Sequence, residues 1–394
     1  MKRIICLIAA ISIMLSLSTT FPKARIKNVA EVINYAPISN TSLDLPVKGA
    51  CLIEASSGAV LYADDEHYSA SPASVTKVMS LLLIAEALEA GCFSLTDNVT
   101  VSAYAASMGG SQVFLEEGES MTVEELIKCM VIASANDATV AMAELVAGNE
   151  SEFVRRMNSR AEELGLKNTS FENTTGLDDD TVSHYSSPYD IALMSRELIK
   201  HDIILKYSSL WQDSIRGGEF ILTNTNRLVR YYEGCNGLKT GSTDKAGFCL
   251  SATAKRDGMQ LIAVVMGAET RDARNNAART LLDFGFANYA VYSDPARFIE
   301  NAEVTSGVKD SVPLASSGYA TVVSRADKGR IELKYAIPDS IAAPISEGDT
   351  VGKIEYYLNG EKIGETCIVA GADVARIGYF ELLFRLLKRI ATGR

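Results

Sequence analysis

The stretch Val78–Leu88, which reads VMSLLLIAEAL, constrains the fold of this chain more than any other segment. Its residues are apolar nearly all the way round a helix, and such a helix is stable only when protein surrounds it. We therefore expect a helix buried inside a sizeable domain. With 394 residues, 47% of them hydrophobic, the chain exceeds the ~100–200 residues of one domain, which predicts two domains.

Patterns of both strands and helices surround this segment, between about residues 40 and 290. Ala50–Ala55 and Ala59–Tyr62 flank a Ser-Ser-Gly turn, and Gly247–Lys255 and Gln260–Gly267 flank an Asp-Gly turn. Short turns of this kind predict two β-hairpins. Apolar periodicity predicts further helices at 123–133, 138–147 and 273–284. This mixture is typical of an enzyme-like domain.

A different pattern follows, from residue 291 to about residue 372. Short alternating segments at 321–323, 331–335, 350–358 and 362–369 are separated by Gly, Pro and Asp. Alternation with a period of two, broken by such residues, predicts a small all-β domain.

The first 20 residues combine Lys2 and Arg3, the apolar run Ile4–Leu17 and a small polar end. This three-part pattern predicts a secretory signal peptide. The alternative is an uncleaved membrane anchor, although the run is shorter than the ~20 residues that a span requires. Either interpretation predicts export to the extracytoplasmic side of the membrane.

Six cysteines follow this segment: Cys51, Cys92, Cys129, Cys235, Cys249 and Cys367. Export permits disulfides, but the chain has no dense framework and no Cys-x-x-Cys pair. We therefore expect most of the cysteines to be small buried apolar residues. A Cys51–Cys249 bridge would require their two strands to be neighbours.

Residues 375–394 predict an amphipathic helix. Aromatic and aliphatic side chains from Ile377 to Ile390 share one wide arc, whereas Glu381, Arg385, Lys388 and Arg389 share the other. The basic arc predicts a helix that lies in an anionic membrane surface and anchors the protein there without crossing it. The alternative is a helix docked on its own protein.

Charge and histidine content exclude several functions. The net charge is −11, which argues against nucleic acid as a partner because binding it requires cations that neutralise phosphates. Only His67, His184 and His201 are present. Three histidines leave little room for a His-rich metal centre or a histidine base, and the chemistry described next requires no metal and no organic cofactor.

The first of three motifs with candidate chemistry is Ser74-Val75-Thr76-Lys77, at the start of the apolar helix. Positions i and i+3 share a helix face, so the Lys77 amine can reach the Ser74 hydroxyl. A lysine acts as the base for a serine nucleophile when desolvation and a second cation lower its pKa. Alone the motif is weak, because a plain helix N-terminus explains it equally well.

The other two motifs supply polar partners. Ser134 and Asn136 lie between two predicted helices, where a hydroxyl could relay a proton and an amide could hold a peptide; a helix cap is the alternative. The segment Lys239–Ser242 would provide the second cation, donors for a substrate carboxylate, and room for a peptide along a strand edge.

In this order, Ser-x-x-Lys, Ser-x-Asn and Lys-Thr-Gly resemble the signature of penicillin-binding proteins and serine β-lactamases. The stretches PASVTK, SANDA, TTGLDDDTVSHYSSPYD and GLKTGSTDKAGFCLSATAKRDG resemble the low-molecular-mass D-alanyl-D-alanine carboxypeptidases, peptidase family S11. The resemblance implies an α/β (α+β) catalytic domain of the serine β-lactamase/DD-peptidase fold at 40–290, with an antiparallel sheet and a helical subdomain. An all-β sandwich at 291–372 and the amphipathic helix complete that architecture.

The resemblance also implies a role for each motif residue. Ser74 would be the acylated nucleophile and Lys77 its general base. Ser134 would return the proton to the leaving D-alanine, while Lys239 would tune Lys77 and attract the terminal carboxylate.

The remaining motif residues would bind the peptide. Asn136 would contact its backbone, and Thr240 and Ser242 would hold its carboxylate on either side of Gly241. The backbone N–H groups of Ser74 and Ser242 would form the oxyanion hole. Some relatives bind the carboxylate through an arginine in the region of Arg271 and Arg274, whereas here we assign it to the two hydroxyls. His184 is expected to be structural.

These roles predict a serine-type carboxypeptidase that removes the terminal D-alanine from peptidoglycan pentapeptide stems and is inhibited covalently by β-lactam antibiotics. One alternative is a β-lactamase of the same fold, although the chain has no Glu-x-x-Leu-Asn segment for fast deacylation. A second is an inactive wall-binding protein, against which the three intact motifs argue. Endopeptidase and transpeptidase activities stay open, because the acyl-enzyme is common to all of them.

Overall fold

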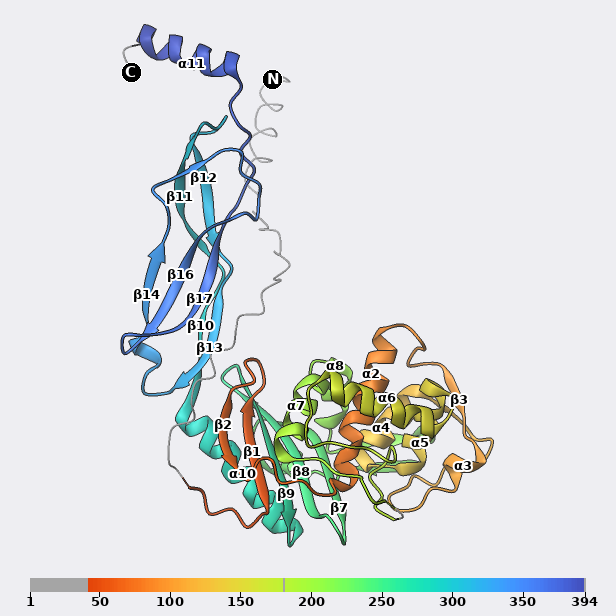
Figure 1. Ribbon diagram of the computed structural model, residues 1–394. Coiled ribbons are helices and arrows are strands. Elements are labelled where there is room, and N and C mark those ends of the chain that lie inside the picture. Colours follow the sequence, from red (N-terminus) through yellow and green to blue (C-terminus); the bar gives the residue numbers. More distant parts are fainter. Residues whose placement is uncertain (1–41, 180, 393–394) are drawn as a thin grey trace, which may run out of the picture. The chain divides into compact units, whose positions relative to one another are not determined.

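The computed structural model describes residues 42–179 and 181–392, so the predicted signal peptide lies outside the described residues (Figure 1). The described chain divides into two compact units. The first contains residues up to 293 together with 320–331, and the second contains 294–319 and the residues from 332 onward. The segment 320–331 therefore packs with the first unit, although the sequence pattern groups it with the β domain.

A five-stranded antiparallel sheet in the order β2-β1-β9-β8-β7 runs through the first unit. Its strands are β1 (Gly49–Glu54), β2 (Val60–Asp64), β7 (Cys235–Thr243), β8 (Gly247–Arg256) and β9 (Met259–Ala268). The β1–β2 and β8–β9 pairs are the two predicted hairpins. The edge strand β7 was not predicted, because its sequence CNGLKTGST has no apolar alternation.

Helices cover both faces of this sheet. Alternate side chains of β9 point to opposite faces, with Val264 in one apolar cluster and Val265 in the other. Helix α10 (Arg271–Asn288) packs on the Val265 face, and α7 (Pro188–Leu198) packs on the Val264 face (Figure 1). The predicted helix 273–284 thus lies within α10.

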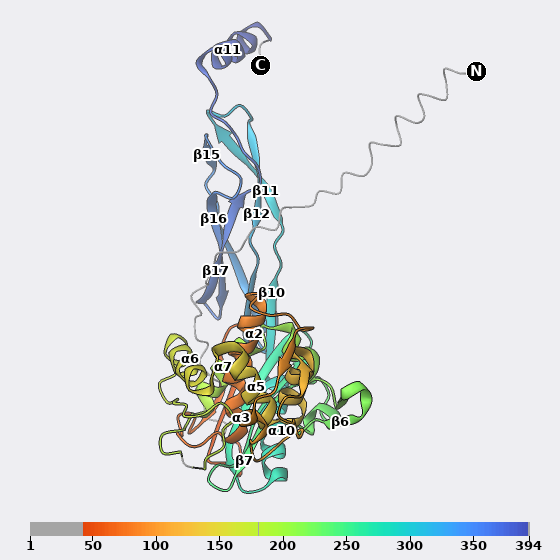
Figure 2. The same ribbon diagram turned by 90° about the vertical axis from the view of Figure 1, so that its right-hand side faces the viewer.

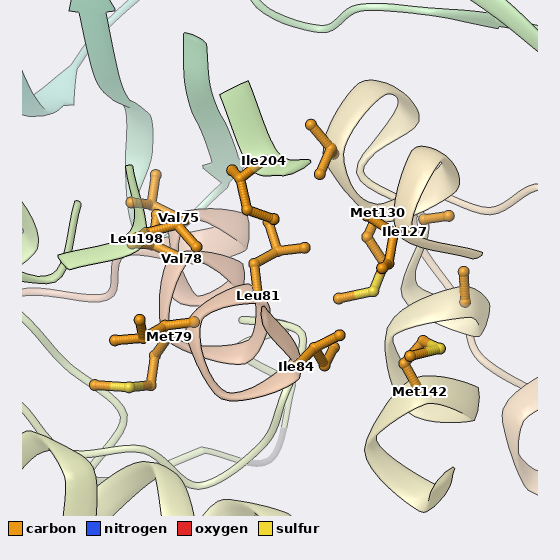
Figure 3. Close-up of a cluster of buried hydrophobic side chains, with 14 of the residues drawn as sticks. Val75, Val78, Met79, Leu81, Ile84, Ile127, Met130, Met142, Leu198 and Ile204 are labelled. Atoms are coloured by element: carbon orange, nitrogen blue, oxygen red, sulfur yellow. The ribbon is translucent and has the colours of Figure 1, made fainter. Parts of the chain in front are cut away.

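The predicted apolar helix is α2 (Lys77–Glu89), and protein surrounds it as expected. Figure 3 shows Met79 and Val78 on the side of Leu198, and Ile84 on the side of Met130. The helices that contact α2 are α5 (Asn136–Ala147), α6 (Glu150–Glu163), α7 and α8 (Asp202–Ser208), and α4 (Val123–Lys128) packs against α5. This helical cluster holds the N-terminus of α2 rigidly beside the sheet.

Shorter elements complete the first unit. They are α3 (Ala103–Ala106), α9 (Leu228–Tyr231), the pair β3 (Asn98–Thr100) with β4 (Ser120–Thr122), the pair β5 (Gln212–Ile215) with β6 (Phe220–Thr223), and the pair β10 (Tyr289–Asp294) with β13 (Tyr319–Ser324).

The second unit is built on a six-stranded sheet, which confirms the predicted all-β domain. Its order is β14-β16-β17-β12-β11-β15, and its long strands lie side by side in Figures 1 and 2. The strands are β11 (Phe298–Thr305), β12 (Ser311–Ser316), β14 (Glu332–Ala336), β15 (Ser340–Ala342), β16 (Thr350–Leu358) and β17 (Glu361–Ala370). Buried apolar residues such as Leu314, Ile354 and Ile368 form its core.

Helix α11 (Tyr379–Thr392) follows this sheet and confirms the predicted C-terminal helix. The Arg385 guanidinium donates hydrogen bonds to the carbonyl oxygens of Gly307 and Val308, so the polar face contacts the β domain. The apolar side chains of α11 are exposed. Among the described residues, no helix combines the length and the apolar character needed to cross a membrane.

Cys51, Cys92, Cys129, Cys235 and Cys249 are free thiols, and Cys51, Cys129 and Cys249 are buried. Cys51 lies on β1 and Cys249 lies on β8, with β9 between the two strands. A Cys51–Cys249 bridge is therefore not formed, because the strands are not neighbours.

Candidate active site

Ser74 and Lys77 lie where a short 3-10 turn, Ala73–Thr76, leads into α2. Lys77 Nζ is 3.1 Å from Ser74 Oγ, 2.5 Å from Asn136 Oδ1 and 2.7 Å from the carbonyl oxygen of Thr175. The Lys77 side chain is fully buried. Burial lowers the pKa of Lys77 well below its usual value, and the positive charge of Lys239 lowers it further. The amine can therefore accept a proton from Ser74.

Ser134 and Lys239 form a second polar pair. Ser134 ends a π-helical turn, Cys129–Ala133, in a left-handed backbone conformation with φ of 63°. A residue with a side chain adopts this conformation at a cost, and such residues cluster at functional sites. The turn directs Ser134 Oγ to Lys239 Nζ, at 2.7 Å. Burial and the charge of Arg274 lower the pKa of Lys239 to about 7.

The Asn136 side chain joins the first pair to a neighbouring loop. Its Oδ1 accepts from Lys77, and its Nδ2 donates to the carbonyl oxygen of Gly109 over 2.7 Å. The next residue, Asp137, is also buried and accepts hydrogen bonds from the backbone N–H groups of Val113 and Leu115. These two residues fix the loop 109–115 against the start of α5.

Strand β7 brings Thr240, Gly241 and Ser242 past the N-terminus of α2. A Cβ atom on Gly241 would lie 2.7 Å from the carbonyl oxygen of Pro72 and 2.8 Å from the backbone nitrogen of Ser74. Glycine is therefore required for β7 to approach Ser74 this closely. The backbone groups of the free β7 edge and of Ser74 consequently face the same space.

These residues surround a cavity of about 590 Å³. Five predicted residues line it: Ser74, Ser134, Thr240, Gly241 and Ser242. The other three, Lys77, Asn136 and Lys239, are buried beneath its surface. The structure thus brings all eight predicted site residues together, five at the cavity wall and three in the layer that supports it.

Two arginines of α10 also line the cavity. Arg271 and Arg274 lie in the first turn of the helix, where positive charge opposes the helix dipole. Arg274 is buried, and burial together with the charge of Arg271 lowers its pKa to about 10. From the sequence we expect Thr240 and Ser242 alone to bind the terminal carboxylate of the substrate, whereas the structure also places Arg274 at the cavity wall. The signal for Arg274 was the resemblance itself, since some relatives bind the carboxylate through an arginine in this region.

A buried histidine supports the catalytic turn from below. His184 Nδ1 accepts from the backbone N–H of Glu172, so Nε2 carries the proton and donates to Thr76 Oγ1 at 2.8 Å. Gly176 passes so close that a Cβ atom there would overlap the carbonyl oxygen of Ala73. His184 does not line the cavity, and it braces the turn that carries Ser74.

No group of three or more His, Cys, Asp or Glu side chains within residues 42–179 and 181–392 is arranged to hold a metal ion. The donors that line the cavity include hydroxyls and guanidiniums, and the Lys77 and Lys239 amines are buried beneath them. The antiparallel sheet flanked by helices, together with the contact between Ser74 Oγ and the buried Lys77 amine, defines a serine hydrolase of the penicillin-binding protein class, in which a lysine is placed to serve as the base.

Comparison with known proteins identifies the family. A sequence model described as D-alanyl-D-alanine carboxypeptidase matches residues 37–270, and one for the C-terminal domain of penicillin-binding protein 5 matches residues 286–376. The D-alanyl-D-alanine carboxypeptidase DacF of Bacillus subtilis is 42% identical over 347 residues, which cover 86% of this chain and 89% of the relative. The chain belongs to the D-alanyl-D-alanine carboxypeptidase family.

Solved structures agree with this family. Penicillin-binding protein 5 from Haemophilus influenzae matches with a TM-score of 0.73 and 31% identity, covering 86% of this chain and 100% of that structure. Penicillin-binding protein D2 from Listeria monocytogenes, in its ampicillin-bound form, matches with a TM-score of 0.55 and 30% identity, covering 62% of this chain and 100% of that structure. The predicted fold class is confirmed.

Proposed function

We propose that this chain removes the terminal D-alanine from peptidoglycan pentapeptide stems through an acyl-enzyme on Ser74. The observation that carries the proposal is the 3.1 Å contact between Ser74 Oγ and the buried Lys77 Nζ, whose pKa is lowered. Lys77 takes the proton as Ser74 Oγ attacks the carbonyl carbon of the D-Ala–D-Ala bond. The negative charge that develops on the carbonyl oxygen is stabilised by the backbone N–H groups of Ser74 and Ser242.

Ser134 and Lys239 serve the leaving group. When the C–N bond breaks, the D-alanine nitrogen needs a proton, and Ser134 Oγ is the cavity hydroxyl that a buried amine supports at 2.7 Å. Water then attacks the Ser74 ester, which releases the shortened stem and restores the hydroxyl. Asn136 supports this cycle by positioning Lys77 through its Oδ1.

The carboxylate of the leaving D-alanine binds at Thr240, Ser242 and Arg274. The two hydroxyl residues line the cavity on the edge of β7, and the Arg274 guanidinium lines it from α10. Arg274 is buried and donates two hydrogen bonds to Asn275 Oδ1, but it has no salt-bridge partner among the described residues. A buried guanidinium without a carboxylate partner favours an anionic ligand, since a carboxylate would replace the solvation that burial removes.

A Ser74→Ala variant tests this function directly. We expect it to lose both D-alanine release from a pentapeptide and covalent labelling by penicillin, while Ser209→Ala, at an exposed serine, keeps both. Persistence of either reaction in Ser74→Ala would exclude Ser74 as the nucleophile. Rapid turnover of penicillin by the wild type, in place of a long-lived adduct, would instead identify a β-lactamase.

The same chemistry supports β-lactam antibiotics as covalent inhibitors, because their strained amide presents a carbonyl carbon to Ser74 Oγ. We also infer that α11 holds the exported protein at the extracytoplasmic membrane surface. Its exposed aromatic and aliphatic side chains, and the exposed Lys388, support this attachment.

A further inference from the structure

The active-site cavity continues past the carboxylate clamp along a wall that the proposed reaction does not use. Trp211, Thr225, Arg227 and Tyr231 belong to this wall. The cavity volume of about 590 Å³ lies within the ~300–1,000 Å³ of sites that hold drug-sized ligands. The cavity must hold the acyl part of the stem as well as the leaving D-alanine, whose methyl side chain has no polar group to offer to this wall.

The wall adjoins the leaving-group side of the scissile bond. Thr240 Oγ1, part of the carboxylate clamp, donates to Thr225 Oγ1 at 2.8 Å. Arg227 lies close enough to Arg274 for its charge to contribute to the lowered pKa of Arg274, after the effects of burial and Arg271. Arg227 therefore lies beside the carboxylate clamp, on the leaving-group side of the cavity.

Buried asparagines hold the wall rigidly. Asn224 Nδ2 donates to the carbonyl oxygens of Ser208 and Leu210, and the backbone N–H of Asn224 donates to the carbonyl oxygen of Trp211. Asn226 Nδ2 donates to the carbonyl oxygen of Gly237 on β7 over 2.7 Å. The backbone of the wall is thus held in place before any ligand binds, which lowers the entropic cost of binding.

The charge on this side exceeds what one carboxylate neutralises. Arg227, Arg271 and Arg274 all line the cavity, and none of the described residues that line it is Asp or Glu; Asp272 is close enough for its charge to act on Arg274, but it does not line the cavity. In the part of the chain that the structure describes, none of the three forms a salt bridge. One terminal carboxylate pairs with one guanidinium, so the cavity is complementary to a ligand with a second anionic group.

Two aromatic rings extend the wall beyond Arg227. The ring centroids of Trp211 and Tyr231 are 6.4 Å apart, and the Arg230 guanidinium lies over both rings. Tyr231 is 64% exposed, so its ring is available for packing against a ligand. An aliphatic chain that ends in a carboxylate fits an apolar surface beside a guanidinium.

We propose that Trp211, Arg227 and Tyr231 form a subsite that accepts leaving residues larger than D-alanine whose side chain ends in a second carboxylate. The inference rests on the proposed function and extends it to the amine component of the bond. The bond that breaks, the Ser74 ester that forms and the proton delivered to the leaving amine are unchanged. Only the released D-amino acid differs, and it is acidic.

Three peptides that differ only in the leaving residue test this subsite. Diacetyl-L-Lys-D-Ala is extended by D-Ala, D-Glu or D-Lys, and kcat/KM is measured for release of each. We expect wild-type enzyme to prefer D-Glu to D-Lys by at least about 10-fold, which corresponds to one hydrogen bond to a charged group. Equal values for D-Glu and D-Lys would overturn the inference, whereas no release of D-Ala would overturn the proposed function.

Variants then locate the preference. Arg227 is exposed, and we expect Arg227→Gln to lower the ratio of D-Glu to D-Ala release by about 10-fold, through KM. Arg279→Gln removes the same charge from an exposed position of α10 that does not line the cavity, so it should leave the ratio unchanged. Tyr231→Ala should lower release of D-Glu more than release of D-Ala. An unchanged ratio in both Arg227→Gln and Tyr231→Ala would overturn the inference.

Discussion

Lys77 and Lys239 are both buried, and they are electrostatically coupled: burial lowers the pKa of Lys77, and the positive charge of Lys239 lowers it further. Each lysine contacts a different serine, Lys77 reaching Ser74 at 3.1 Å and Lys239 reaching Ser134 at 2.7 Å. The positive charge of Lys239 therefore lowers the pKa of the base, Lys77. The same Lys239 amine contacts Ser134, which delivers the proton to the leaving group.

This coupling predicts the behaviour of Lys239→Met. Removal of the charge raises the pKa of Lys77, so a larger fraction of Lys77 is protonated at neutral pH and cannot accept the Ser74 proton. We expect acylation by penicillin to slow by about 10²–10⁴-fold, the usual contribution of a general base. The acid limb of the rate profile should also move to higher pH. If Lys239→Met were slower but the acid limb of its pH–rate profile did not move, Lys239 would act only through Ser134.

Gly241→Ala should remove activity although the charged residues of the motifs, Lys77 and Lys239, are unchanged. The new Cβ atom would lie 2.8 Å from the backbone nitrogen of Ser74, so β7 must shift away from the oxyanion site. Loss of one oxyanion donor costs about 10²–10³-fold in kcat. Stopped-flow acylation measures the effect, with Gly329→Ala as the control, because a Cβ atom there meets nothing within 4 Å. Full activity in Gly241→Ala would contradict the close approach of β7.

His184 predicts a pH dependence of stability. Burial lowers the pKa of His184 to about 4, below its value of about 6.5 in an unfolded chain. Between these two pKa values the unfolded state binds more protons than the folded state does. The contribution of neutral His184 to the free energy of unfolding is therefore complete above pH ~6.5 and is lost as the pH falls towards 4. The loss is at most about 3 kcal/mol.

Urea unfolding of the wild type and of His184→Asn at pH 7 and pH 4.5 measures this contribution. The variant lacks the hydrogen bond to Thr76, so we expect it to be less stable at pH 7 by about 1–3 kcal/mol. Its free energy of unfolding should change less between the two pH values. Equal pH dependence in both proteins would mean that His184 does not stay neutral in the folded state.

Local sequence patterns predicted much of the fold, because the short-range sequence of each main element favours the structure that the element adopts. The apolar sequence of α2 requires burial, and the turns of β1–β2 and β8–β9 favour hairpins, so neither depended on distant residues. Motif order then placed the candidate nucleophile, base and proton relay. Each motif is itself local, because its residues lie within three positions of one another.

What the sequence did not predict depends on tertiary context. Strand β7 has little strand character of its own, and it is held by pairing with β8 and by its approach to Ser74. Arg274 reaches the cavity only because α10 packs across the sheet. The separation of Cys51 from Cys249 follows from strand order, which no local pattern encodes.

The exposed apolar face of α11 predicts how the protein binds membranes. Leu383 lies near the middle of this face and is 42% exposed, whereas Glu381 lies on the polar face. Leu383→Glu removes about 1.5–3 kcal/mol of apolar burial in a lipid surface and adds a charge that anionic lipid repels. We expect binding of the full chain to anionic vesicles to weaken about 10-fold or more in a sedimentation assay. Glu381→Ala should bind at least as well as the wild type, because it removes a negative charge and adds no polar group to the apolar face. If Leu383→Glu sedimented with vesicles as well as the wild type, α11 would dock on protein rather than on lipid.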